Sequence, residues 1–123
     1  MKHTLESLKY TDRSIASYEG INRHTRELIE RTGYTGDAME RMEAYTSRKI
    51  KEVKHHHNYW QNLITKIDDE RYRDILTMRY IKGRTVEVVA DELFYSVRYI
   101  SRLTNQAIRE LAKLHEKRTH SED

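Results

Sequence analysis

Polar side chains near the carboxyl end of the chain have the types and the spacing to recognise DNA bases. Arginine can donate two hydrogen bonds to the O6 and N7 atoms of guanine, and asparagine can pair in a similar way with adenine. Residues three, four or seven positions apart share one face of a helix. The residues with this spacing are Arg98, Ser101, Arg102 and Asn105. Together with Val97, which precedes them, they are the predicted base contacts with double-stranded DNA.

A second set of polar residues is predicted to hold the DNA phosphates. Hydroxyl, amide and guanidinium groups, especially near helix N-termini, bind phosphate oxygens without reading the sequence. The predicted phosphate contacts are Thr85, Ser96, Gln106 and Arg109. The charge distribution agrees, because residues 97–118 contain six Lys or Arg against two Glu, whereas residues 84–96 contain one Arg against three acidic residues. A basic helix beside an acidic one indicates a face for an anionic partner.

Two short helices joined by a tight turn would position these side chains, as in a helix-turn-helix. Thr85 and Ser96 are each placed to cap the start of one helix with a side-chain oxygen. Val89 and Ala90 are small or β-branched, which lets the helices cross closely. The predicted core of the motif is Val89, Ala90, Leu93, Ile100, Leu103, Ala107 and Leu111.

The turn of this motif carries Phe94 and Tyr95 where glycine is common. We expect Phe94 to adopt the left-handed conformation, which strains a non-glycine residue by about 1 kcal/mol. We also expect its ring to be buried between the helices, because burial of ~1.5–3 kcal/mol would offset that strain.

A long helical hairpin is predicted before the helix-turn-helix. A weak apolar face indicates one helix from residue 3 to about 31, and Arg31–Asp37 contains two glycines that break it, with Asp37 as the N-cap of the next helix. Apolar residues then recur at coiled-coil spacing: Met39, Met42, Thr46, Ile50, Val53, His57, Trp60, Ile64 and Ile67. This second helix could pack against the first or pair with a second subunit, and periodicity does not choose between them.

A further helix is predicted between the hairpin and the motif. The acidic run Asp68–Glu70 suits a helix start, and Gly83 is a C-cap candidate. The apolar face of this helix consists of Tyr72, Ile75, Leu76 and Tyr80.

Composition supports an all-α protein with a long N-terminal helical hairpin and a C-terminal helix-turn-helix domain. The 123 residues include no proline and four glycines, and 35% are charged, so long helices with few loops are expected. The expected parts are residues 1–68, residues 69–118 and a frayed tail at 119–123. The absence of cysteine excludes disulfides and thiolate metal sites, and apolar runs are too short to span a membrane. Because no secretory signal is evident, a cytoplasmic protein is expected.

The sequence from Tyr72 to Leu114 resembles region four of bacterial sigma factors. Arg79-Tyr80 matches the end of a helix in that family, and Thr85, Glu87 and Ala90 match the next one. The remaining matching positions are Ser96, Ile100, Ala107, Ile108 and Leu111. Sigma factors usually carry Arg-Glu after the cap and a Gln further on, whereas this chain has Val97-Arg98 and Arg102. The DNA site is therefore expected to differ from a standard −35 element.

The whole chain resembles small phage-encoded regulators of the ArpU and RinA type, which have a helical N-terminal half followed by a sigma-region-four-like motif. This resemblance implies DNA binding in phage transcription inside a bacterial host, as an activator of late genes. It also implies host RNA polymerase as a partner, and the N-terminal helices would contact polymerase or form a homodimer. The alternative is a protein-interaction module that binds polymerase or another protein without reading DNA.

Other candidate sites have simpler explanations. Consecutive helical residues point about 100° apart, so His55, His56 and His57 cannot all hold one ion, and Glu52 with His56 lacks a third ligand. No metal site or cofactor is therefore expected, and His57 is assigned to the hairpin seam. The chain lacks phosphate-binding loops and catalytic motifs, and the acidic run at Asp68–Glu70 is explained by capping. An enzyme is not expected.

Overall fold

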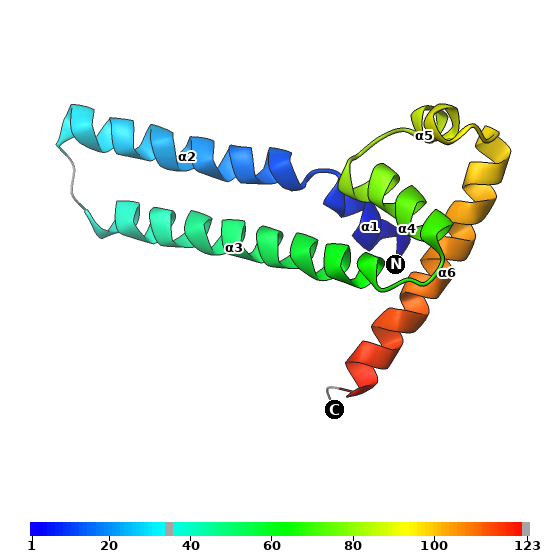
Figure 1. Cartoon of the computed structure of the whole chain (residues 1–123). Coiled ribbons are helices and arrows are strands. Elements are labelled where there is room, and N and C mark those ends of the chain that lie inside the picture. Colours follow the sequence, from blue (N-terminus) through cyan, green and yellow to red (C-terminus); the bar gives the residue numbers. More distant parts are fainter. Residues whose placement is uncertain (34–35, 122–123) are drawn as a thin grey trace. The chain divides into compact units, whose positions relative to one another are not determined.

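The computed structural model describes residues 1–33 and 36–121, except for the side chains of residues 120 and 121 (Figure 1). Within these ranges every regular element is a helix, which confirms the all-α prediction. The elements are α1 (Lys2–Leu8), α2 (Thr11–Thr32), α3 (Asp37–Thr65), α4 (Glu70–Leu76), the π-helical turn η1 (Thr77–Ile81), α5 (Val86–Leu93) and α6 (Val97–Ser121). The part of the expected tail before residue 122 is thus helical, and residues 122 and 123 lie outside the described residues.

The chain forms two compact units. Residues Tyr10–His56 make one unit, which we call the hairpin unit. Met1–Lys9 and the residues from His57 onward make the other, which we call the helix-turn-helix unit. Because α3 crosses the boundary at His57, its last turns belong to the second unit.

The hairpin unit consists of α2 and residues 37–56 of α3, which lie side by side and run in opposite directions (Figure 1). The buried Thr46 hydroxyl donates a hydrogen bond to Asn22 Oδ1, and Arg26 Nε lies 3.5 Å from Glu43 Oε1. The two helices therefore pair within one chain. Met42, predicted on the seam, is 45% exposed. Thr46, which is also predicted on the seam, is buried in this contact, whereas Met42 is left open to solvent.

The predicted first helix is divided in two. α1 ends at Leu8 and α2 begins at Thr11, although neither glycine nor proline marks the break. Leu5 and Leu8 are buried in the helix-turn-helix unit. Because of this break, α1 packs in the helix-turn-helix unit and not in the hairpin unit.

The first long helix ends at Gly33, one of the two glycines that predicted a break there. Gly33 has a φ of 69°, and its N–H bonds to the Ile29 carbonyl to close the end of α2. Tyr34 and Thr35, within the predicted break, lie outside the described residues. Asp37 is the first residue of α3 rather than the N-cap before it.

The helix predicted after the acidic run contains an unexpected π turn. Asp69 caps α4 by accepting the N–H of Arg71 at 2.9 Å, as the sequence indicated. From Thr77 onward the hydrogen bonds widen, and the Lys82 N–H reaches the Thr77 carbonyl at 2.9 Å. Gly83 follows with a φ of 67°. Tyr80, which lies within the π turn, is fully buried.

Two apolar clusters hold the helix-turn-helix unit together. The first joins α1, the end of α3 and the residues just after it, α4, η1 and α6. Its buried members are Leu5, Leu8, Trp60, Leu63, Ile64, Ile67, Leu76, Tyr80, Ala107 and Leu111. The second lies between α4, α5 and α6, and consists of Ile75, Val89, Ala90, Ile100 and Leu103. Both clusters use α6, so the inward face of that helix is fixed along several turns.

Candidate nucleic-acid interface

Both helices of the motif begin at the predicted capping residues. Thr85 precedes α5, and its Oγ1 accepts the N–H of Val88 at 3.3 Å. Ser96 precedes α6, and its Oγ accepts the N–H of Tyr99 at 3.1 Å. Each hydroxyl uses its oxygen for the cap and keeps its hydrogen, so it can still donate to a phosphate.

The turn between α5 and α6 is closed by two backbone hydrogen bonds. The Tyr95 N–H bonds to the Ala90 carbonyl at 3.0 Å, and the Phe94 N–H bonds to the Asp91 carbonyl at 3.4 Å. This pairing is a Schellman motif, whose left-handed position is usually glycine. Phe94 occupies that position with φ 60° and ψ 38°, which confirms the predicted conformation.

The predicted burial of Phe94 is wrong. Its side chain is 94% exposed, so the strain of the left-handed backbone is not offset by packing within the chain. The reason lies in the neighbouring core. Leu93 and Tyr99, rather than Phe94, are the side chains near the turn that pack against the cluster between α4, α5 and α6.

α6 separates its core residues from its candidate contacts. Ile100, Leu103, Ala107 and Leu111 are buried on one side. At about 100° per residue, the opposite side is a wedge of roughly 100°. From the start of α6 to residue 109, the exposed residues in that wedge are Arg98, Ser101, Arg102, Asn105 and Arg109. Val97, at the start of the helix, is 42% exposed. The predicted base contacts therefore stand together on an accessible surface.

The arginines of this surface have no ion-pair partner among the described residues. Arg98, Arg102 and Arg109 are exposed and form none of the ion pairs found there. By contrast, Arg84 pairs with Glu92, and Lys113 pairs with Glu110 at 3.3 Å. Unpaired guanidinium groups on one face are available for an external anion.

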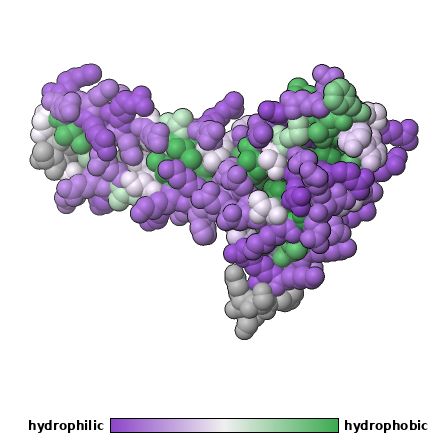
Figure 2. Space-filling view, in the orientation of Figure 1, coloured by the Kyte–Doolittle hydropathy of each residue, from purple (hydrophilic) through white to green (hydrophobic). Residues whose placement is uncertain are grey.

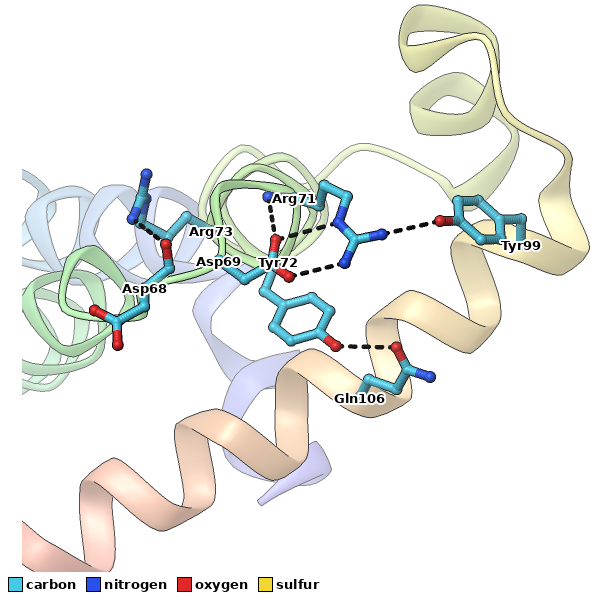
Figure 3. Close-up of polar contacts among 7 residues, drawn as sticks. All are labelled: Asp68, Asp69, Arg71, Tyr72, Arg73, Tyr99 and Gln106. Atoms are coloured by element: carbon cyan, nitrogen blue, oxygen red, sulfur yellow. Dashed lines mark hydrogen bonds and ion pairs between the residues drawn. The ribbon is translucent and has the colours of Figure 1, made fainter.

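A polar network ties the start of α4 to the first turn of α6 (Figure 3). Arg71 donates two hydrogen bonds to the carboxylate of Asp69. Its Nε lies 3.2 Å from Oδ1, and its Nη2 lies 2.9 Å from Oδ2. The same guanidinium donates to the Tyr99 hydroxyl at 3.1 Å. Tyr99 lies one residue after Arg98, so this network fixes the helix turn that presents Arg98, one of the predicted base contacts.

A second contact lies two turns further along α6 (Figure 3). The Tyr72 hydroxyl donates to Gln106 Oε1 at 3.0 Å. This bond uses the oxygen of the amide and leaves its NH2 group to donate elsewhere, which suits the predicted phosphate contact. Together, Tyr72 and Arg71 hold α6 against α4 at two points.

The pKa values of the two charged residues in this network are shifted in opposite directions. The hydrogen bond from Arg71 lowers the pKa of Asp69, and the Asp69 carboxylate raises the pKa of Arg71. A carboxyl whose pKa is lowered in the folded state stabilises the fold above its unfolded pKa and loses this effect as the pH falls through the folded pKa. At neutral pH Asp69 is therefore ionised, and both its helix cap and its hydrogen bonds with the Arg71 side chain are intact.

The network was not predicted from the sequence. Arg71 and Tyr99 are 28 positions apart, so no local spacing connects them. The only local sign is the pair Asp69 and Arg71, which are two positions apart at a helix start. That pattern indicates a cap, but it does not reveal the tyrosine that the arginine reaches.

The histidine run considered as a metal site does not form a cluster of ligands among the described residues. His55 and His56 are exposed and His57 is half-buried. Within residues 1–33 and 36–121, no three side chains of His, Cys, Asp or Glu are grouped so that they could hold a metal ion. The helices in these ranges include none with the length and apolar character of a membrane span.

Comparison with known proteins identifies the C-terminal part. Residues 69–113 match the family model for sigma-70, region 4. Curated protein sequences and solved structures gave no significant match. Sigma region 4 is a regulatory domain that binds DNA and RNA polymerase and is not catalytic. The match spans α4, η1, α5 and most of α6, which contain the capped motif and its polar face. Residues 69–113 of this chain are therefore similar to sigma-70 region 4, and the structure forms a helix-turn-helix there.

Proposed function

We propose that the protein is a transcription regulator that binds double-stranded DNA at specific sequences. The observation that carries this proposal is the face of α6 with three unpaired arginines and Asn105, held in place by the core and by the contacts from α4. In this arrangement the N-terminal half of α6 enters the major groove, as in other helix-turn-helix domains.

The residues divide into two roles in this proposal. Side chains near the start of α6 address base edges, and these are Val97, Arg98, Ser101, Arg102 and Asn105. The phosphate contacts are Thr85, Ser96, Gln106 and Arg109. The guanidinium groups of Arg98 and Arg102 suit guanine, and the amide of Asn105 suits adenine.

We further propose a role in phage transcription, as an activator of late genes of the ArpU and RinA type. The resemblance of the sequence to those regulators supports this proposal. Residues 69–118 would bind DNA, and host RNA polymerase would be a second partner. Of the helices in residues 1–68, those of the hairpin unit would form a homodimer or contact polymerase, and the exposed Met42 and Tyr45 of that unit are available for this.

The first test is binding-site selection with the full chain, followed by affinity measurements on the selected duplex at several salt concentrations. Arg102→Ala is expected to lower discrimination at one base position by ~1–3 kcal/mol, whereas Arg109→Ala should weaken all sequences alike. Arg41→Ala is the matched control, because it removes the same charge from an exposed site on the hairpin unit.

Affinity should also fall steeply with salt, because phosphate contacts release counterions. If no sequence is enriched and both arginine variants bind DNA like the parent, the proposal is wrong. The domain would then be a protein-interaction module, and binding to RNA polymerase would be the property to measure.

Ser96→Asp separates the capping role of this residue from its predicted phosphate contact. Aspartate caps a helix as well as serine, so the free energy of unfolding should change by less than about 0.5 kcal/mol. Near a phosphate the added negative charge should weaken DNA binding by roughly tenfold or more. Ser96→Ala is the counterpart, since loss of the cap costs about 1 kcal/mol without adding charge. Unchanged DNA affinity of the aspartate variant would remove Ser96 from the interface.

A further inference from the structure

An open apolar groove lies beside the turn of the helix-turn-helix, on the outer side of α5. Its volume is about 590 Å³, and its lining includes Val88, Phe94, Tyr95 and Val97. These side chains are 40% to 94% exposed, although they are large and apolar. Figure 2 shows apolar residues gathered on the surface over α5. Contiguous apolar surface of this kind commonly marks a binding site.

Phe94 has no evident role in the stability of the isolated chain. It adopts the left-handed conformation that favours glycine, and its ring is almost fully exposed. A glycine would relieve the strain and lose almost no packing. The side chain at this position therefore favours a contact outside the chain over stability within it.

Two carboxylates determine what kind of partner fits. Glu87 and Asp91 line the groove, stand four positions apart on α5, and have no ion-pair partner among the described residues. Glu92, in contrast, is paired with Arg84. Residues at this spacing share a helix face, so the groove has a concentrated negative charge. Such a surface repels phosphates and attracts lysine and arginine.

We propose that this groove is a docking site for a second protein, through a peptide segment with an apolar side chain flanked by Lys or Arg. Phe94, Val88 and Tyr95 would enclose the apolar side chain, and Glu87 and Asp91 would pair with the flanking cations. Apolar anchors surrounded by complementary charge are typical of specific protein contacts. This inference goes beyond the proposed DNA binding, because the groove has the opposite charge to the arginine face of α6.

The groove lies next to the first turn of α6. Val97 lines it and is also a predicted base contact. A protein segment bound here would consequently be held beside the DNA-reading surface. The contact thus suits a regulator that brings a partner to its binding site.

Selection from a displayed library of random 16-residue peptides tests the proposal directly. The full chain is used as bait, and enriched peptides are synthesised and titrated by fluorescence anisotropy. Enriched sequences are expected to contain an aromatic or aliphatic residue with Lys or Arg nearby. Phe94→Gly should weaken their binding by about tenfold or more, and the double change Glu87→Gln with Asp91→Asn by roughly fivefold. Their affinity should also fall with added salt.

Matched controls keep these outcomes distinct from unfolding and from loss of DNA binding. Asp74→Asn removes an exposed carboxylate that does not line the groove, and it should leave peptide affinity unchanged. Phe94→Gly should melt at the same temperature as the parent or higher. Arg102→Ala should still bind the selected peptides, so failure of the DNA proposal would not affect this test.

Three results would overturn the proposal. The first is a selection that enriches no peptides. The second is a set of peptides that bind the groove variants as tightly as the parent. The third is DNA affinity that falls with Phe94→Gly while no peptide binds, which would assign the groove to the DNA interface.

Discussion

Leu5→Ala and Leu8→Ala are each expected to lower the free energy of unfolding of the helix-turn-helix unit by about 2–5 kcal/mol. Both side chains are at most 1% exposed, and they pack in the same cluster as Leu76, Tyr80 and Leu111. Truncation removes buried methyl groups and leaves a cavity that this cluster cannot fill without moving. A seven-residue terminal helix would thereby influence the domain that carries the DNA-binding surface.

Urea unfolding followed by Trp60 fluorescence measures this effect. Trp60 is the only tryptophan of the chain and lies in the affected cluster. Ile21→Ala is the matched control, because Ile21 is 41% exposed on α2, and exposed substitutions usually change stability by less than about 0.5 kcal/mol. Equal effects of Leu5→Ala and Ile21→Ala would show that α1 does not belong to this core.

The helix-turn-helix could be predicted from the sequence because its determinants are local. Hydroxyl residues at Thr85 and Ser96 cap the helices that directly follow them, and the apolar spacing of α6 identifies its inward face without any distant partner. The exposed arrangement of Arg98, Arg102 and Asn105 follows from the same periodicity, since residues opposite a core face solvent. The candidate interface was therefore predictable to the level of which side chains share a face.

The features that escaped prediction depend on contacts between distant segments. The apolar residues of α1 match the helical period of the hairpin equally well, so only the folded chain shows that Leu5 packs elsewhere. Which side chains near the turn pack between α5 and α6 is decided only in the folded chain, where they include Leu93 and Tyr99 but not Phe94. The bond from Arg71 to Tyr99 likewise requires α4 and α6 to be in place. Periodicity indicates which face is buried, but it does not indicate what covers that face.

Tyr80→Phe is expected to raise the free energy of unfolding by about 1–3 kcal/mol, because the hydroxyl of Tyr80 is buried without a hydrogen-bond partner among the described residues. Its ring contributes to the core, and Lys9 Nζ lies 5.3 Å from the ring centroid. Phenylalanine keeps the ring and removes only the unsatisfied group. Tyr72→Phe is the matched control with the opposite sign, since it removes the hydroxyl bonded to Gln106 and should cost about 0.5–1.5 kcal/mol.

Alkaline pH gives an independent measure of the same hydroxyl. Burial raises the pKa of Tyr80, and the positive charge of Arg79 opposes this only in part. Above the ordinary tyrosine pKa of about 10, the unfolded chain releases this proton before the folded chain does. The folded state then binds more protons, so the stability contributed by Tyr80 should decline as the pH rises toward the raised pKa. Tyr80→Phe should remove this part of the decline, whereas Tyr72→Phe should retain it. If Tyr80→Phe instead destabilises the protein at neutral pH, the hydroxyl must have a bonding partner such as a buried water molecule, and its burial would then contribute to stability rather than oppose it.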